Sequence, residues 1–105
     1  MTAHADLQQR ISEWADLTFG RAQVLPSLRR VQSELLELES AIQPGEAIAP
    51  AAEEAADVLI CLFRLASVVG FDLLAEAERK HAINLGRHWK LNGDGTGQHV
   101  KELTR

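Results

Sequence analysis

The sequence predicts an all-α protein built as a four-helix bundle. Apolar residues recur at helical spacing in four segments, and no segment shows the alternating pattern of a strand. A further observation is the stretch from Glu53 to Gly70, where apolar residues cover an arc of roughly 220° on a helical wheel. Surface helices have narrower apolar stripes, so we expect this segment in the middle of an assembly.

The first two predicted helices carry narrow apolar stripes. One runs from about Ala5 to Thr18, and Gly20 is its terminator. The next runs from about Ser27 to Ile42, with Ser27 as a candidate N-cap. The Pro44-Gly45 pair then predicts a firm stop and a turn.

The third predicted helix is the apolar stretch itself, and Gly70 occupies the usual position of a C-terminal glycine. Asp72 is a good N-cap for a fourth helix, which we expect to run to about Trp89 or Lys90. The segment Asn92–Gly97, which reads N-G-D-G-T-G, is predicted to lack regular structure.

The length of 105 residues predicts one domain, with a helical core over about residues 5–90 and an irregular tail over 91–105. A net charge of −4 argues against generic binding to nucleic acid. The single cysteine, Cys61, excludes an internal disulfide and is interpreted as a small core residue. The N-terminus resembles no signal peptide, and no apolar run could cross a bilayer. We therefore expect a cytoplasmic protein without a membrane partner.

Two pairs of acids share one spacing. The second helix carries E-x-x-E, and after a gap of 16 residues the third carries E-x-x-D. Two antiparallel helices would bring the pairs face to face, and four carboxylates form a site suited to Mg²⁺ or Mn²⁺. The alternative is a solvated helix face, which is the commoner origin of an isolated E-x-x-E. The four residues are Glu34, Glu37, Glu54 and Asp57.

Other polar and aromatic residues leave alternatives open. Lys80, Asn84 and Arg87 recur at i, i+4 and i+7 on a face expected to point inward. They could pair with the carboxylates, or they could hold the phosphates of a metal-bound nucleotide. Trp14 could be a core residue or could stack on a nucleobase, and Phe19 in the following loop could do likewise.

Three motifs carry a resemblance to a known family. E-L-L-E at Glu34–Glu37, E-A-A-D at Glu54–Asp57 and K-H-A-I-N-L-G-R-H-W at Lys80–Trp89 resemble the MazG-like all-α nucleoside triphosphate pyrophosphohydrolases. The resemblance covers nearly the whole chain. The F-G at Gly20 and the segment D-G-T-G-Q-H-V-K resemble the phage-type dATP/dGTP diphosphohydrolase (MazZ-like) branch.

The resemblance implies hydrolysis of a (deoxy)nucleoside triphosphate to the monophosphate and pyrophosphate, on a purine deoxynucleotide such as dGTP or dATP. It also implies Mg²⁺, with Mn²⁺ as a substitute, a homodimer or homotetramer, and the host cytoplasm if the protein is viral. The alternatives are house-cleaning of non-canonical or pyrimidine dNTPs (dUTP or dCTP type), and a non-catalytic helical dimerisation module.

The resemblance also implies residue roles. Glu53, beside Glu54, leaves open which of the two acids is a ligand. The implied metal ligands are Glu34, Glu37, Glu54 and Asp57, with Glu34 or Glu37 also catalytic by orienting the attacking water. The implied phosphate contacts are Lys80, Asn84 and Arg87, and the implied base contacts are Trp14 and Phe19.

Overall fold

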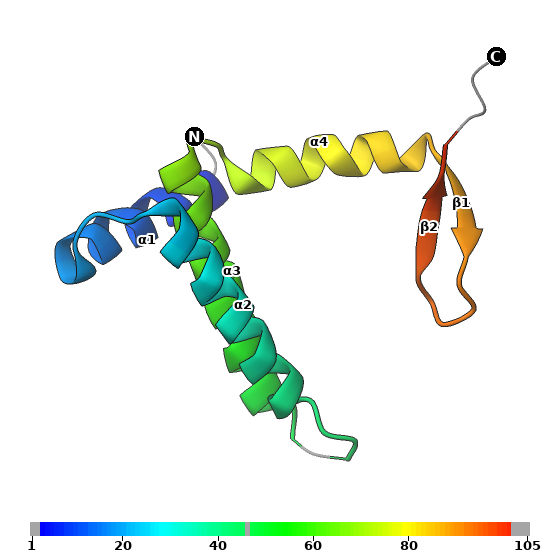
Figure 1. Cartoon of the computed structure of the whole chain (residues 1–105), viewed down its shortest axis with the longest axis horizontal. Helices are drawn as coiled ribbons and strands as arrows, with labels where there is room; N and C mark the ends of the chain where they lie inside the picture. Colours follow the sequence, from blue (N-terminus) through cyan, green and yellow to red (C-terminus); the bar gives the residue numbers. More distant parts are fainter. Residues whose placement is uncertain (1–2, 46, 102–105) are drawn as a thin grey trace. The chain divides into compact units, whose positions relative to one another are not determined.

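The structure is a computed structural model that describes residues 3–45 and 47–101, with side chains from residue 6 onward. The described residues form four helices and one two-stranded sheet (Figure 1), which confirms the predicted all-α class and adds a hairpin. The elements are α1 (Ala3–Phe19), α2 (Val24–Ala41), α3 (Ile48–Val69), α4 (Leu73–Leu85), β1 (His88–Leu91) and β2 (Gly97–Val100).

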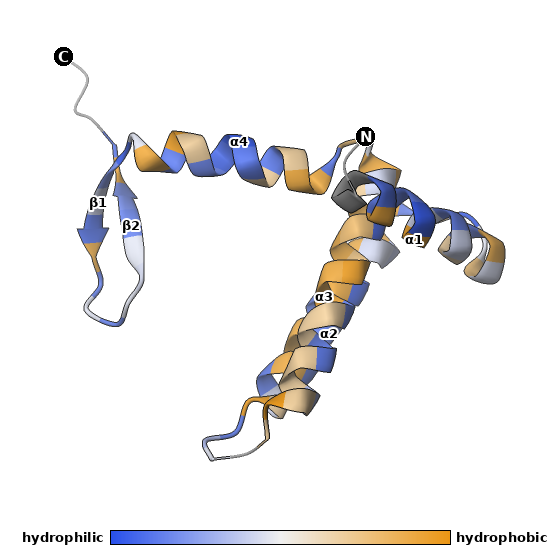
Figure 2. Cartoon of the chain, turned by 180° about the vertical axis from the view of Figure 1, so that it is seen from behind, coloured by the Kyte–Doolittle hydropathy of each residue, from blue (hydrophilic) through white to orange (hydrophobic). Residues whose placement is uncertain are grey.

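Contacts divide the chain into two units, of which the first ends at Leu74 and the second begins at Ala75. In the first unit α2 and α3 lie side by side and antiparallel, and α1 packs against α3 (Figure 1). Apolar residues run the length of α3 (Figure 2). The buried apolar core of the described residues is small and consists of Ala15, Val31, Phe63 and Ala66.

Two helix ends in the first unit test the local predictions. Gly70 ends α3 as predicted, with φ of 109° and its N–H donating to the Ala66 carbonyl at 2.8 Å. The start predicted for α2 is wrong, because the helix begins at Val24 and Ser27 lies inside it. Pro26 is tolerated there because a proline in the first turn removes no intrahelical hydrogen bond.

A buried glutamine joins α1 to the turn between α3 and α4. The Gln8 amide nitrogen donates to the Phe71 carbonyl at 2.9 Å and to the Ser67 hydroxyl at 3.1 Å. Its amide oxygen accepts from the N–H of Leu73 at 3.0 Å. The start of α4 directly after Asp72 is therefore as predicted, and a side chain from α1 satisfies its first N–H.

In the second unit α4 ends at Leu85, so the predicted continuation to Trp89 or Lys90 is wrong. The chain instead forms an antiparallel hairpin in which His88 faces Val100. The irregular structure predicted from residue 91 onward is wrong at Leu91, which ends β1, and over Gly97–Val100, which is a strand, whereas residues 92–96 are irregular as predicted.

The turn of this hairpin is the N-G-D-G-T-G segment. Gly93 and Gly95 have φ near 90°, a conformation that glycine adopts without steric cost. The Asp94 carboxylate accepts from both the hydroxyl and the N–H of Thr96, and the Asn92 N–H donates to the Thr96 carbonyl. Glycine-rich turn chemistry thus closes a hairpin here rather than leaving a loose tail.

Within the described part of the chain, no single helix is long and apolar enough to span a bilayer, although α3 and α4 taken together as a bent pair meet the length and composition criteria.

Candidate metal centre and adjoining pocket

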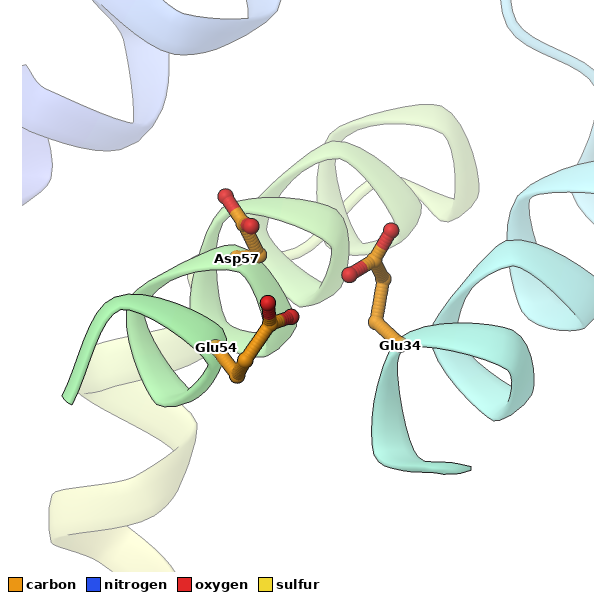
Figure 3. Close-up of side chains that lie close together, drawn as sticks. All are labelled: Glu34, Glu54 and Asp57. Atoms are coloured by element: carbon orange, nitrogen blue, oxygen red, sulfur yellow. The ribbon is translucent and has the colours of Figure 1, made fainter. Parts of the chain in front are cut away.

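Three carboxylates converge where α2 and α3 lie against each other. Glu34 comes from α2, and Glu54 and Asp57 come from α3. One oxygen from each lies within 4.8 Å of the others, and the three side chains point toward one another (Figure 3). The antiparallel pairing of the two helices therefore brings together three of the four carboxylates that the paired spacing predicted to meet.

The cluster is electrostatically strained in the absence of a cation. Burial raises the pKa of Glu34, and neighbouring Glu37 and Asp57 raise it further, while Arg30 lowers it. Burial also raises the pKa of Glu54, with added contributions from Glu37 and Asp57. Carboxylates with raised pKa values at one place are a physical sign of uncompensated negative charge.

Two oxygens of the cluster are left without a partner. Among the described residues, Oε2 of Glu34 and Oε2 of Glu54 are buried and accept no hydrogen bond. A buried acceptor without a donor is costly, and a charged one more so. A divalent cation would satisfy both, and an all-oxygen donor set suits Mg²⁺ or Mn²⁺. The residues present thus fit the predicted metal.

Two other acids lie near the cluster in sequence but are not part of it. Glu37 is exposed and lies outside the three-carboxylate group, yet it is close enough to raise the pKa of both Glu34 and Glu54. Glu53 is exposed and does not belong to the group. The structure therefore directs Glu54, and not its neighbour Glu53, toward Glu34.

A cavity of about 680 Å³ adjoins the cluster, within the first unit. Glu34 and Asp57 line it, and so do Trp14 and Phe19. The two aromatic rings meet edge to face with centroids 5.5 Å apart. Trp14 is 58% exposed, so it is not a core residue, and Phe19 is 68% exposed. The cavity therefore offers both carboxylates and an aromatic wall.

Three further residues of this cavity were not among the site residues predicted from the sequence. They are Arg30, Cys61 and Arg64. Cys61 is half-buried and faces the cavity, so its interpretation as a core residue is wrong. Arg30 pairs with Glu34 one helical turn away, and Arg64 shares a wheel sector with Asp57, so local spacing carried a signal for both arginines.

The predicted phosphate-binding residues belong to the second unit. The Arg87 guanidinium donates to the Asn84 side-chain oxygen at 3.2 Å. Arg87 lies beyond the end of α4, so its predicted place on the helix face at i+7 is wrong. Lys80 and Arg87 both lower the pKa of His99, which places their charges in one neighbourhood. Their contact with phosphates stays a prediction.

No family model matches the chain. The chain is 38% identical over 96 residues to a dATP/dGTP diphosphohydrolase of Salmonella phage PMBT28, over 91% of this chain and 31% of that protein. It thus spans about a third of that relative's length. Its structure is similar to a MazG-like pyrophosphohydrolase of cyanophage S-2L, with a TM-score of 0.79, 25% identity and 97% of each chain covered.

The chain is thus similar in sequence to a phage dATP/dGTP diphosphohydrolase and in fold to a MazG-like protein. The cyanophage MazG-like protein is bound to dGDP and to three catalytic Mn²⁺ ions per active site. The MazG-like resemblance carried by the sequence motifs is confirmed, and so is its phage branch.

Proposed function

We propose that this chain hydrolyses a deoxynucleoside triphosphate to the monophosphate and pyrophosphate with the help of divalent cations. One observation carries the proposal. Two buried carboxylate oxygens without a donor lie beside Asp57, which lines a cavity that also has an aromatic wall. Similarity to a dATP/dGTP diphosphohydrolase and to a nucleotide-bound MazG-like protein supports it.

The acids have separate tasks in this proposal. Glu34, Glu54 and Asp57 hold the cation, with Glu37 beside them. Bound Mg²⁺, or Mn²⁺ in its place, offsets phosphate charge and acts as a Lewis acid on the phosphate oxygens. Glu37 is the better candidate for orienting the attacking water and accepting its proton, because it is exposed and outside the three-carboxylate group. Glu34 is buried and already paired with Arg30.

Water attacks the α-phosphorus, and the bond from that phosphorus to the bridging oxygen of the β-phosphate breaks. Pyrophosphate leaves with the bonding electrons, and the proton of the water passes to the carboxylate. Lys80, Asn84 and Arg87 contact the phosphates and stabilise the charge on the leaving group. Trp14 and Phe19 bind the base of a purine deoxynucleotide such as dGTP or dATP.

We also propose that the chain acts as a homodimer or homotetramer in the cytoplasm. Apolar side chains of α3, among them Leu59 and Val69, remain exposed on the chain alone. Exposed apolar surface of this kind is typical of association surfaces. Light scattering of the purified chain would measure its mass, and a monomer at micromolar concentration would contradict the assembly.

The test of the activity is a panel of canonical and modified nucleoside triphosphates, incubated with Mg²⁺ or Mn²⁺ and scored for pyrophosphate and monophosphate. We expect both products in equal amounts from at least one purine deoxynucleotide. Release of inorganic phosphate and a diphosphate would show a different reaction. Absence of any product, together with no thermal stabilisation by metal and nucleotide, would favour a non-catalytic helical module.

A further inference from the structure

Arg64 is a cation of the cavity that the proposed reaction does not use. It lies on α3 with a side chain that is 21% exposed. Its Nη2 donates to the Gly20 carbonyl at 2.6 Å and lies 3.3 Å from Oδ1 of Asp16. The guanidinium carbon also lies 5.6 Å from the centre of the Phe19 ring. One side chain of α3 therefore contacts Asp16, Phe19 and Gly20 at the end of α1.

Ala15 anchors the last part of α1 in the core, but the larger side chains around it are held less firmly. Trp14 and Phe19 are largely exposed, and Leu17 between them is 88% exposed. These side chains are not fixed by burial in the core. Helix ends fray readily when no packing opposes it. The contacts of Arg64 with Gly20, Asp16 and Phe19 supply the missing constraint.

Arg64 also restricts Trp14, because Phe19 contacts both side chains. The Arg64 guanidinium lies over the Phe19 ring, and the Phe19 and Trp14 rings are perpendicular to each other. A cation above an aromatic ring and an edge-to-face ring pair are each favourable interactions. Arg64, Phe19 and Trp14 therefore form a chain of contacts from α3 to the aromatic wall of the cavity.

We propose that Arg64 is a positioning residue that holds the Trp14–Phe19 wall in the geometry that accepts a nucleobase. The inference rests on the proposed function, because it explains how the same site is kept ordered for the base. Arg64 acts through Phe19 and the Gly20 carbonyl. A preordered wall improves affinity because the side chains need not be ordered at the moment of binding.

The test uses the full chain carrying Trp89→Phe, which leaves Trp14 as its single tryptophan because the sequence has two. Arg64→Met and Arg64→Lys are compared in this background. Arg10→Met is the matched control, since Arg10 is an exposed arginine that also lies 3.3 Å from an aspartate, Asp6. Arg64→Lys keeps the charge but loses the planar fork of the guanidinium.

We expect Arg64→Met to raise the KM for dGTP about tenfold and to leave kcat nearly unchanged, because ordering two aromatic side chains then accompanies binding. Arg64→Lys should fall between Arg64→Met and the parent. Trp14 fluorescence anisotropy without ligand should decrease in Arg64→Met. Binding of inorganic triphosphate with Mn²⁺, a probe that lacks a base, should not change.

An unchanged KM and an unchanged Trp14 anisotropy in Arg64→Met, equal to those of Arg10→Met, would overturn the inference. Equal loss of dGTP and inorganic triphosphate binding would also overturn it, because it would show a general structural role. If the Trp89→Phe chain releases no pyrophosphate, the proposed function is wrong, independently of the role of Arg64. The anisotropy of Trp14 and its quenching by dGDP still decide the role of Arg64.

Discussion

The guanidinium of Arg30 lies 2.7 Å from Oε1 of Glu34, although the arginine side chain is 65% exposed and the glutamate side chain is 3% exposed. A surface cation thus compensates a carboxylate buried between two helices. Burial nevertheless raises the pKa of Glu34, so the compensation is incomplete. A bound divalent cation and Arg30 therefore act on the same negative charge.

Replacing Arg30 tests whether this arginine and a bound metal ion neutralise the same Glu34 carboxylate. In Arg30→Met the buried Glu34 loses its ion pair, so the melting temperature of the metal-free protein should fall. The increase in melting temperature on adding Mn²⁺ should then exceed that of the parent, because metal would replace the lost charge. Thermal melts in EDTA and in Mn²⁺ measure both effects. Arg29→Met is the control, and equal Mn²⁺ responses in the two variants would contradict the idea.

Neutralising the converging acids should abolish turnover and leave the helices intact. We expect Glu54→Gln and Asp57→Asn to lower the rate of pyrophosphate release by at least about 100-fold, because each removes a charge that holds the cation. Circular dichroism should match that of the parent. Glu53→Gln is the neighbouring control and should retain its activity, since Glu53 lies outside the three-carboxylate group. Near-parental rates in Asp57→Asn would show that the metal assignment is wrong.

Gln8 should be a main contributor to the stability of the first unit. Removing its amide in Gln8→Ala leaves the Leu73 N–H and the Phe71 carbonyl without their partner. We expect the free energy of unfolding in urea to fall by about 1–3 kcal/mol. Gln9→Ala, where the side chain is exposed and bonds to Glu13 on the same helix, should change it by less than about 0.5 kcal/mol. Equal effects would disprove the special role of Gln8.

The hairpin should weaken in mild acid because of His99. His99 is exposed, yet partial desolvation of its ring lowers its pKa below the usual range, and the charges of Arg87, Lys101 and Lys80 lower it further. Between this lowered pKa and the ordinary value of about 6.5, the unfolded hairpin binds more protons than the folded one. The stability that this neutral histidine contributes is therefore complete above about pH 6.5 and is lost as the pH falls through that window.

An NMR titration of the His99 imidazole would measure this pKa directly. Lys101→Met should move it upward, because one of the repelling charges is gone. Lys90→Met on the partner strand serves as the comparison. A His99 pKa at or above that of a free histidine would refute the prediction.

The acid cluster was predictable because its determinants are local. Spacing on a helix places Glu34 on one side of α2, and the Pro44-Gly45 turn signals an antiparallel partner. The choice between Glu53 and Glu54 was not predictable, because it depends on how α3 is rotated about its axis. The burial of Phe63 and Ala66 against the neighbouring helices fixes that rotation.

The hairpin and the role of Arg64 lay beyond local patterns for different reasons. β1 reads H-W-K-L and alternates polar and apolar residues over only four positions, whereas β2 reads G-Q-H-V and does not alternate, so the pattern was too short to mark a hairpin. Arg64 bonds to residues 44 and 48 positions earlier in the chain, and only the packing of α1 on α3 brings them together. Contacts of this range have no signature in the periodicity of a single helix.

The regular backbone of α3 sets a length scale for the site. Asp57 and Arg64 both line the cavity, and seven residues of α-helix separate them by about 10 Å along the axis. An α-helix does not stretch, so side-chain rotamers can adjust this span only slightly. In the proposed function, α3 therefore fixes the distance between the metal-bound phosphates and the base. We therefore expect a molecule that holds its base farther from or nearer to its phosphates to bind more weakly, whichever base it carries.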